Sequence, residues 1–110
     1  NDQVGTPTWT RDLAEIVYQH GVSDFNENMV HAVASGYGSW FDFAREIASA
    51  LPDAEKYFLS PVTSDKILTA AKRPTFSALD NSETKGPIIG NWRERWKLAA
   101  AEVLAEFLTK

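Results

Sequence analysis

The sequence predicts an α/β fold with three to four helices and a few short strands. Apolar side chains recur at helical spacing in three segments, over residues 9–20, 40–51 and 92–107. A short, β-like run with few polar residues follows the first of these segments: Met29-Val30-His31-Ala32-Val33. Such runs are typical of strands that are covered on both faces of a parallel sheet. Together, the three helical segments and this run indicate the α/β class.

The N-terminal segment is expected to end a strand and to turn into the first helix. Pro7 fixes the approach to that helix, and Thr8 or Thr10 can cap it. Gly21 is the expected helix stop. His20 falls on the apolar stripe near the end of the helix, where a structural role is the favoured interpretation.

The other two helices carry clear start signals. Ser39 followed three residues later by Asp42 is a variant of the capping box, and Pro52 closes the helix that it opens. Asn91 with Glu94 opens the last helix in a similar way. One face of this last helix is apolar and carries Trp92, Trp96, Ala99, Val103 and Phe107.

Shorter elements are expected between the second and the last helix. Residues 57–59 and 61–62 indicate a strand that is interrupted or ended at Pro61. Residues 67–72 indicate a short helical piece.

His31 and Trp40 each allow two interpretations. His31 has no neighbour in sequence that would complete a metal site or a nucleophile pair, so a buried, hydrogen-bonded imidazole is favoured. Trp40 lies in the first turn of its helix beside a glycine turn, where its ring could face a ligand. Core packing is nevertheless favoured, because tryptophan is mostly a packing residue.

Composition excludes several classes of function. The net charge of −4 and an isoelectric point near 5.1 argue against a nucleic-acid partner, which requires a basic face. The absence of cysteine excludes disulfides and thiolate chemistry and fits a cytoplasmic protein. No apolar run reaches membrane-spanning length, so no membrane partner is expected. The chain begins at Asn1 without a methionine, and we expect it to be a piece of a larger protein.

The sequence shows neither a catalytic constellation nor a metal-binding cluster. It has no glycine-rich dinucleotide loop, and none of Tyr18, Tyr37 and Tyr57 is followed four residues later by lysine. We therefore assign no catalytic and no metal-binding residue. By itself, this chain is expected to catalyse no reaction.

The segment Arg73-Pro74-Thr75-Phe76-Ser77-Ala78-Leu79-Asp80 is the strongest candidate for a binding motif. An arginine beside a proline can hold its guanidinium steady, and its planar fork of donors meets phosphate oxygens in pairs. Lys72 adds a second positive charge alongside. The alternative is a surface Arg-Pro that ends one element while Asp80 caps the next.

Six motifs occur in one order along the chain. They are Asp2-Gln3-Val4-Gly5-Thr6-Pro7-Thr8, Asp12-Leu13-Ala14, His31, Gly38-Ser39-Trp40-Phe41-Asp42-Phe43-Ala44, the Arg73 to Asp80 segment, and Asn91-Trp92-Arg93. This order resembles the C-terminal part of the dTDP-4-dehydrorhamnose reductase family, and the resemblance covers nearly the whole chain. It implies that residues 1–110 are the C-terminal substrate-binding region of an extended Rossmann-type reductase of the short-chain dehydrogenase class.

The resemblance also implies a reaction and a missing partner domain. Members reduce dTDP-4-dehydro-L-rhamnose to dTDP-L-rhamnose for cell-surface polysaccharide. Their N-terminal Rossmann domain binds NADPH or NADH and carries the catalytic tyrosine and lysine. That domain is expected upstream of this chain, and no cofactor is expected to bind the chain alone.

Residue roles follow from the same resemblance. Arg73 matches the arginine of the Arg-Pro motif and is expected to contact the diphosphate of a dTDP-sugar. Gly5, Thr6, Pro7 and Thr8 match the loop that faces the sugar-binding cleft, and Trp40 matches the Ser-Trp position. Glu83 stands about where the family often has lysine, although Lys85 is nearby.

Two further expectations concern partners. A catalytically idle relative, similar to the regulatory β subunit of methionine adenosyltransferase, is the alternative function; a free-standing helical interaction module would make six motifs a coincidence. Met29-Val30-His31-Ala32-Val33 resembles a late strand of the Rossmann sheet, and without its neighbours it would expose an apolar edge. We therefore expect the isolated chain to form a homodimer through this segment or to swap elements with a second copy.

Overall fold

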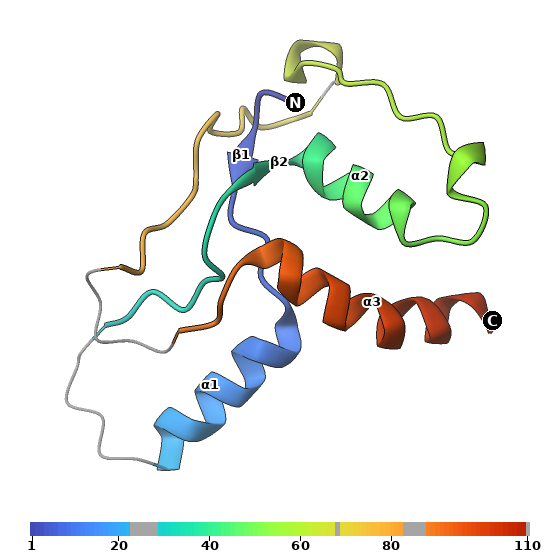
Figure 1. Cartoon of the computed structure of the whole chain (residues 1–110). Coiled ribbons are helices and arrows are strands. Elements are labelled where there is room, and N and C mark those ends of the chain that lie inside the picture. The colour runs from blue at the N-terminus through green and yellow to red at the C-terminus, as the bar shows by residue number, and fades with distance from the viewer. Residues whose placement is uncertain (23–28, 68, 83–87, 110) are drawn as a thin grey trace.

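The computed structural model describes residues 1–22, 29–67, 69–82 and 88–109. Within these ranges the chain forms three α-helices and one two-stranded sheet (Figure 1), which confirms the predicted helices and short strands of the α/β class. The elements are β1 (Val4–Gly5), α1 (Thr10–Val22), β2 (Gly38–Ser39), α2 (Trp40–Ser49), the 3-10 turns η1 (Ala54–Lys56) and η2 (Ser64–Lys66), and α3 (Trp92–Leu108).

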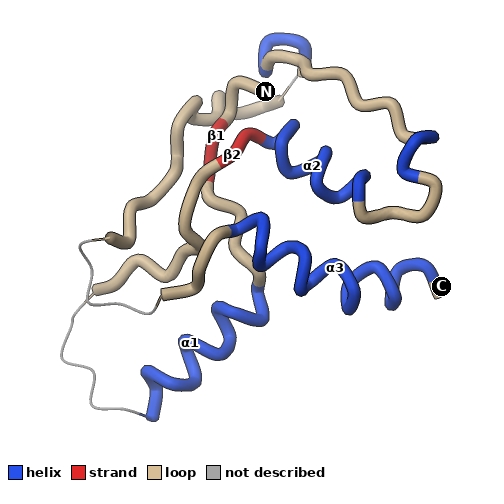
Figure 2. The backbone as a smooth tube through the Cα atoms, viewed as in Figure 1, coloured by secondary structure: helices blue, strands red, loops and turns tan. Residues whose placement is uncertain are grey.

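The strand β1 lies between two segments that are distant in sequence (Figure 2). On one side it pairs antiparallel with β2, with Val4 opposite Ser39. On the other side the Val4 N–H donates to Thr75 O at 2.8 Å, and the Ser77 N–H donates to Val4 O at 2.8 Å. This second contact is a parallel bridge between Val4 and Phe76. The N-terminal motif and the Arg73 segment are therefore joined backbone to backbone.

The predicted start of α2 is confirmed. The Asp42 N–H donates to Ser39 Oγ at 3.1 Å, while the Ser39 N–H donates to the Asp42 carboxylate at 2.9 Å, which completes a capping box. The helix ends at Ser49, with Ala50 as its C-cap, before the predicted end at residue 51.

The predicted cap of α3 is also confirmed, but its apolar face is packed over only part of its length. The Asn91 side chain accepts a hydrogen bond from the Arg93 N–H at 3.0 Å. Trp92 and Ala99 are each 2% exposed, whereas Phe107 is 70% exposed. The core therefore lies at the N-terminal half of this helix.

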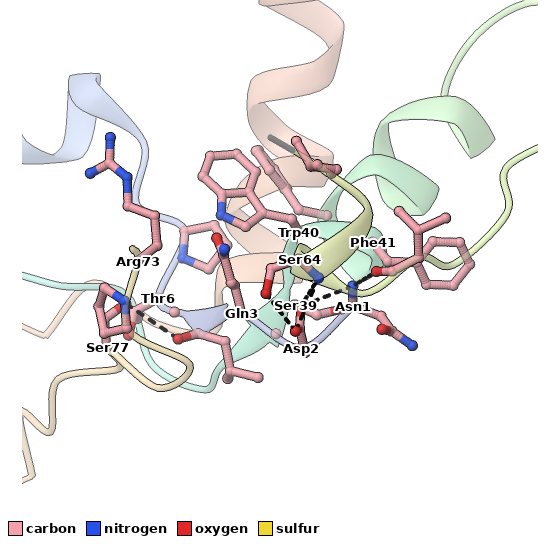
Figure 3. A pocket seen from close by; sticks show the side chains of 18 of the residues that line it. Asn1, Asp2, Gln3, Thr6, Ser39, Trp40, Phe41, Ser64, Arg73 and Ser77 are labelled. Carbon is pink, nitrogen blue, oxygen red and sulfur yellow. Dashed lines mark hydrogen bonds and ion pairs between the residues drawn. The ribbon is translucent and has the colours of Figure 1, made fainter. Parts of the chain in front are cut away.

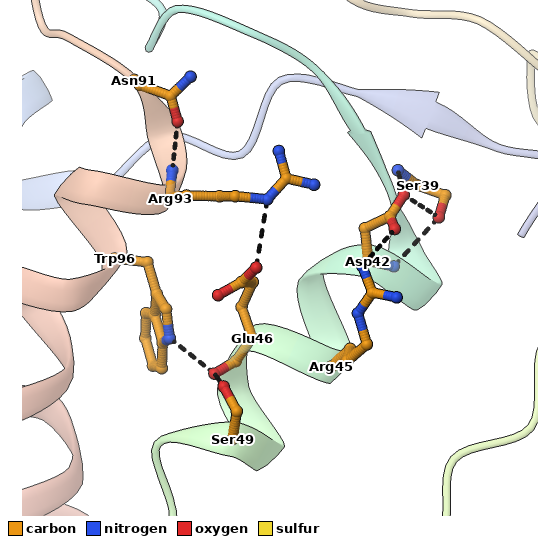
Figure 4. A network of polar contacts seen from close by, with 8 residues as sticks. All are labelled: Ser39, Asp42, Arg45, Glu46, Ser49, Asn91, Arg93 and Trp96. Atoms are coloured by element: carbon orange, nitrogen blue, oxygen red, sulfur yellow. Dashed lines mark hydrogen bonds and ion pairs between the residues drawn. The ribbon is translucent and has the colours of Figure 1, made fainter.

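Packing of α2 on α3 forms one side of that core (Figure 4). The ring of Phe43 meets the rings of Trp92 and Trp96 edge to face, each with centroids 5.9 Å apart. Trp96 Nε1 donates to the carbonyl of Glu46 at 3.1 Å, and the Glu46 carboxylate pairs with Arg93 Nε at 3.2 Å.

The helix α1 is tied to α3 by a paired carboxylate. Asp12, 8% exposed, accepts from Arg95 Nε at 3.0 Å and from Arg95 Nη2 at 2.5 Å. This bond raises the pKa of Arg95 above its ordinary value. The prediction that Gly21 stops α1 is wrong, because the helix continues to Val22. A glycine ends a helix by taking a positive φ, and Gly21 does not do so.

Three predicted elements are absent from the described residues. Residues 29–33 form no strand, and Met29 is 79% exposed. Residues 57–59 and 61–62 likewise form no strand, and the described part of 67–72 is not helical. A strand needs a partner to receive its backbone hydrogen bonds, and none of the described segments lies alongside in that role. Dimerisation through residues 29–33 stays a prediction.

The imidazole of His31 is half-buried, and its Nδ1 lies 3.1 Å from Asp80 O, which confirms the predicted hydrogen bond. None of the helices in the described ranges combines the length and the apolar character that crossing a membrane requires.

Candidate functional site

A cleft of about 950 Å³ opens where β1, the start of α2 and the Arg73 segment meet. One part of its lining comes from residues 1–7 and another from residues 38–43 at the entry to α2. The remaining walls come from residues 73–77 and from the described residues between 60 and 69. Figure 3 shows the lining side chains around Trp40.

Five of the six predicted site residues line this cleft. They are Gly5, Thr6, Pro7, Trp40 and Arg73. Thr8 does not line it; its hydroxyl donates to Thr6 O at 3.1 Å and accepts from the Ala34 N–H at 3.2 Å. Thr8 therefore holds the loop that precedes α1 rather than facing the cleft.

Arg73 supplies the only cationic side chain among the described residues that line the cleft. Its side chain is exposed, and it takes part in none of the hydrogen bonds or ion pairs of the described residues. The bridge between Val4 and Phe76 fixes the chain just after it, and Ser77 Oγ donates to Val4 O at 3.3 Å. The guanidinium therefore stands on an anchored segment with all of its donors available.

Gly5 and Thr6 hold the two motifs in contact. A Cβ built on Gly5 would lie 3.3 Å from Ser77 Oγ, so glycine leaves room for the Ser77 side chain. The hydroxyl of Thr6 accepts a hydrogen bond from the Leu79 N–H at 3.2 Å. These contacts shape the cleft floor from pieces of chain about 70 positions apart.

The prediction that Trp40 packs in the core is wrong. Its side chain is 70% exposed and lines the cleft (Figure 3), while Phe43, one turn later, packs against Trp92 and Trp96. Residues three apart on a helix point in directions about 60° apart, so Trp40 can face the cleft while Phe43 packs on α3. The Trp40 N–H also donates to Gln3 O at 3.3 Å, which joins this turn to β1.

Asp2 is a cleft residue whose role was not predicted. Its carboxylate accepts from the Ser64 N–H at 2.9 and 3.0 Å and from Ser64 Oγ at 2.7 Å. The hydroxyl bond, followed by the amide bond, lowers the pKa of Asp2 below its ordinary value. A partner 62 positions away leaves no mark in local spacing, so sequence patterns offered no signal for it.

Asp80, at the end of the Arg73 segment, makes a local hydrogen bond. Its carboxylate accepts from the Ser82 N–H at 2.8 Å, and this bond lowers the pKa of Asp80. Asp80 is thus engaged in a local turn and does not line the cleft. Glu83 and Lys85, the positions of the expected departure from the family pattern, lie outside the described residues.

Known proteins share both the sequence pattern and this fold. The family described as the RmlD substrate binding domain matches residues 1–109. The chain is 32% identical over 107 residues to a probable dTDP-4,6-dihydroxy-2-methyloxan-3-one 4-ketoreductase of Streptomyces antibioticus, covering 97% of this chain and 36% of that protein.

Two solved structures have a similar fold. A dTDP-4-dehydrorhamnose reductase of Clostridium acetobutylicum superposes with a TM-score of 0.79 at 36% identity, over 94% of this chain and 37% of that one. A dTDP-4-dehydrorhamnose reductase of Bacillus anthracis, in complex with NADP, superposes with a TM-score of 0.72 at 25% identity, over 92% of this chain and 36% of that one. The chain therefore spans little more than a third of each of these relatives.

Proposed function

The chain belongs to the RmlD substrate-binding domain family, and from this premise we propose that its cleft binds the dTDP-sugar of a dTDP-4-dehydrorhamnose reductase. The reaction proposed for the whole enzyme is reduction of the 4-keto group of dTDP-4-dehydro-L-rhamnose to the hydroxyl of dTDP-L-rhamnose. NADPH or NADH would be the reductant. The relatives named above are reductases, which supports this class of reaction.

The observation that carries the proposal is the position of Arg73 in the cleft. A diphosphate needs donors that can meet several oxygens at once, and a guanidinium does this in a fixed plane. Arg73 is the only cationic side chain among the described lining residues and has no competing carboxylate partner within them. We assign it to the diphosphate of the ligand.

Trp40 supports a ring-shaped ligand in the same cleft. Its indole is 70% exposed in the first turn of α2, which gives a large apolar face beside polar groups. Aromatic faces pack well against flat or apolar ring surfaces. We assign Trp40 to one ring of the ligand, and Gly5, Thr6 and Pro7 to the floor beneath it.

The cofactor and the catalytic residues are proposed to come from outside this chain. The sequence has no glycine-rich dinucleotide loop and no tyrosine followed four residues later by lysine. A Rossmann domain upstream in the full protein would supply both, and a cytoplasmic location follows from the same proposal. A cleft that lacks one of its walls is expected to bind weakly.

The test is a titration with dTDP-L-rhamnose, observed by ligand NMR, which detects weak binding. Arg73→Ala is expected to weaken binding by roughly 1.5–3 kcal/mol, about 10- to 150-fold, because a charge-assisted contact is lost. Lys72→Ala is the matched control. It removes the same charge from the neighbouring residue, whose side chain does not line the cleft.

Equal effects of the two substitutions would show that only net charge matters. The assignment of Arg73 to the diphosphate would then be wrong. If the folded wild type binds no dTDP-sugar, even with the remaining reductase domain supplied, the catalytically idle regulatory relative becomes the leading function.

A further inference from the structure

The wall of the cleft between residues 60 and 69 belongs to a long connection with little structure of its own. Between the end of α2 and the Arg73 segment, the described chain holds only the 3-10 turns η1 and η2. Phe58 in this connection is 93% exposed, so the chain is not packed there. Long connections of this kind take their position from the few contacts that tie them down.

The ties of this connection converge on the N-terminal segment. Among the described residues between 52 and 74, the hydrogen bonds that reach the rest of the chain go to Asn1 and Asp2. Ser64 donates its N–H and its hydroxyl to the Asp2 carboxylate, and the main-chain nitrogen of Asn1, here the chain terminus, donates to Val62 O. Figure 3 shows the contact between Asp2 and Ser64 at the edge of the cleft beside Trp40.

An ionised carboxylate suits this task. It offers acceptor sites on two oxygens, and hydrogen bonds to it are stronger than those between neutral groups. Both carboxylate oxygens of Asp2 accept hydrogen bonds from Ser64, and the shortest, at 2.7 Å, comes from the Ser64 hydroxyl. It is also anchored itself, because Gln3 and Val4, the next residues, are bonded to α2 and to the Arg73 segment.

We propose that Asp2 is a positioning residue that fastens the wall formed by residues 60–67 and 69 to the floor of the cleft. In this role Asp2 need not touch the ligand. It keeps Val62, Ser64 and Ile67 facing the same space as Trp40 and Arg73. The effect of Asp2 on ligand affinity rests on the proposed function, whereas its hold on the wall does not.

The first measurement follows the wall without any ligand. In Asp2→Asn the amide keeps the size of the side chain but loses the charge and one acceptor oxygen. We expect the Ser64 amide to exchange its hydrogen about tenfold faster and trypsin to cut after Lys66 faster by a similar factor. Ser64→Ala removes the hydroxyl from the other side of the contact and is expected to act in the same direction, while Ser64→Thr keeps the hydroxyl and should restore protection.

Asp53→Asn is the matched control. Asp53 lies in the same connection, is exposed, and pairs with Lys56 at 2.7 Å. Its φ of 56° is one that asparagine adopts readily. This substitution makes the same chemical change away from the cleft and is expected to leave exchange at Ser64 and affinity unchanged.

The second measurement is the affinity for dTDP-L-rhamnose, which should fall about three- to tenfold in Asp2→Asn while the thermal midpoint of the helices changes little. Unchanged exchange at Ser64 in both Asp2→Asn and Ser64→Ala would overturn the proposal. Faster exchange with unaltered affinity would overturn its positioning part. Faster exchange together with a wild type that binds no dTDP-sugar, even with the remaining reductase domain supplied, would support the fastening by Asp2 and overturn the proposed function instead.

Discussion

The backbone of Gly38 lies directly against the indole of Trp92. A Cβ built on Gly38 would stand 2.8 Å from Trp92 Cζ2 and 3.3 Å from Cε2. Trp92 is 2% exposed and meets the ring of Phe43 edge to face. Because Gly38 belongs to β2 and Trp92 opens α3, this contact joins the small sheet that forms the cleft to the core.

Gly38→Ala is expected to destabilise the chain by about 1–3 kcal/mol, the usual cost of adding atoms to a well-packed interior. The indole cannot move away without disturbing Phe43. Urea unfolding followed by circular dichroism measures the change in midpoint. Gly21→Ala is the matched control, since a Cβ there meets no atom within 4 Å. It replaces a helical glycine and is expected to raise stability by about 0.5–1 kcal/mol. A neutral Gly38→Ala would show that β2 is free to shift.

Arg95 and Asp12 are expected to respond asymmetrically to substitution. Asp12 is 8% exposed, whereas the Arg95 side chain is 30% exposed. Arg95→Met leaves a nearly buried carboxylate without its partner, and we expect a loss of about 1–3 kcal/mol. Asp12→Asn leaves an arginine that water can reach, so its cost should be smaller. A double-mutant cycle on urea midpoints gives the coupling energy. Equal costs for the two single variants would contradict this asymmetry.

The local signals in the sequence predicted the helices well. Ser39 with Asp42 and Asn91 before Trp92 are caps in the structure, because capping needs only residues three or fewer positions apart. The two motifs that meet in the cleft were also found, as separate pieces. Their contact through Val4 and Phe76 was not, since a bridge across 72 positions has no local pattern.

The failures have a common physical cause. Residues 29–33 have the composition of a strand, but strand formation depends on a neighbour that pairs with the backbone. Trp40 has the composition of a core residue, but its exposure depends on where the first turn of α2 lies relative to α3. Asp2 was noted only as part of a motif, because Ser64 is brought to it by the whole connection. Strand formation, side-chain exposure and the choice of a distant hydrogen-bond partner all depend on tertiary context.

The capping box of α2 is expected to weaken only in acid. The hydrogen bond from the Ser39 hydroxyl, then that from the Ser39 amide, lowers the pKa of Asp42, with smaller help from the charges of Arg45 and Arg93. A carboxyl with a lowered folded pKa stabilises the fold above its unfolded pKa of about 3.9 and loses that contribution as pH falls through the folded value.

The stability difference between wild type and Asp42→Asn should therefore be constant from about pH 5 to pH 8 and shrink below about pH 4. Urea midpoints measured for both proteins across this range test it, and the subtraction removes the effects of Asp2 and Asp80, whose pKa values are also lowered. If the stability difference between wild type and Asp42→Asn changes near neutral pH, a group other than Asp42 is responsible for the pH dependence.

Trp40 and Trp92 should separate binding from stability. Trp40 is 70% exposed, so Trp40→Ala is expected to change the free energy of unfolding by no more than about 0.5 kcal/mol. It should weaken dTDP-L-rhamnose binding about 2- to 10-fold, because an aromatic contact is lost. Trp92→Ala removes a fully buried ring and is expected to cost about 3–5 kcal/mol, enough to unfold a marginal domain. Unfolding midpoints and ligand NMR on both variants distinguish the two roles. If Trp40→Ala loses stability but keeps its affinity for the ligand, Trp40 is a packing residue and not a binding residue.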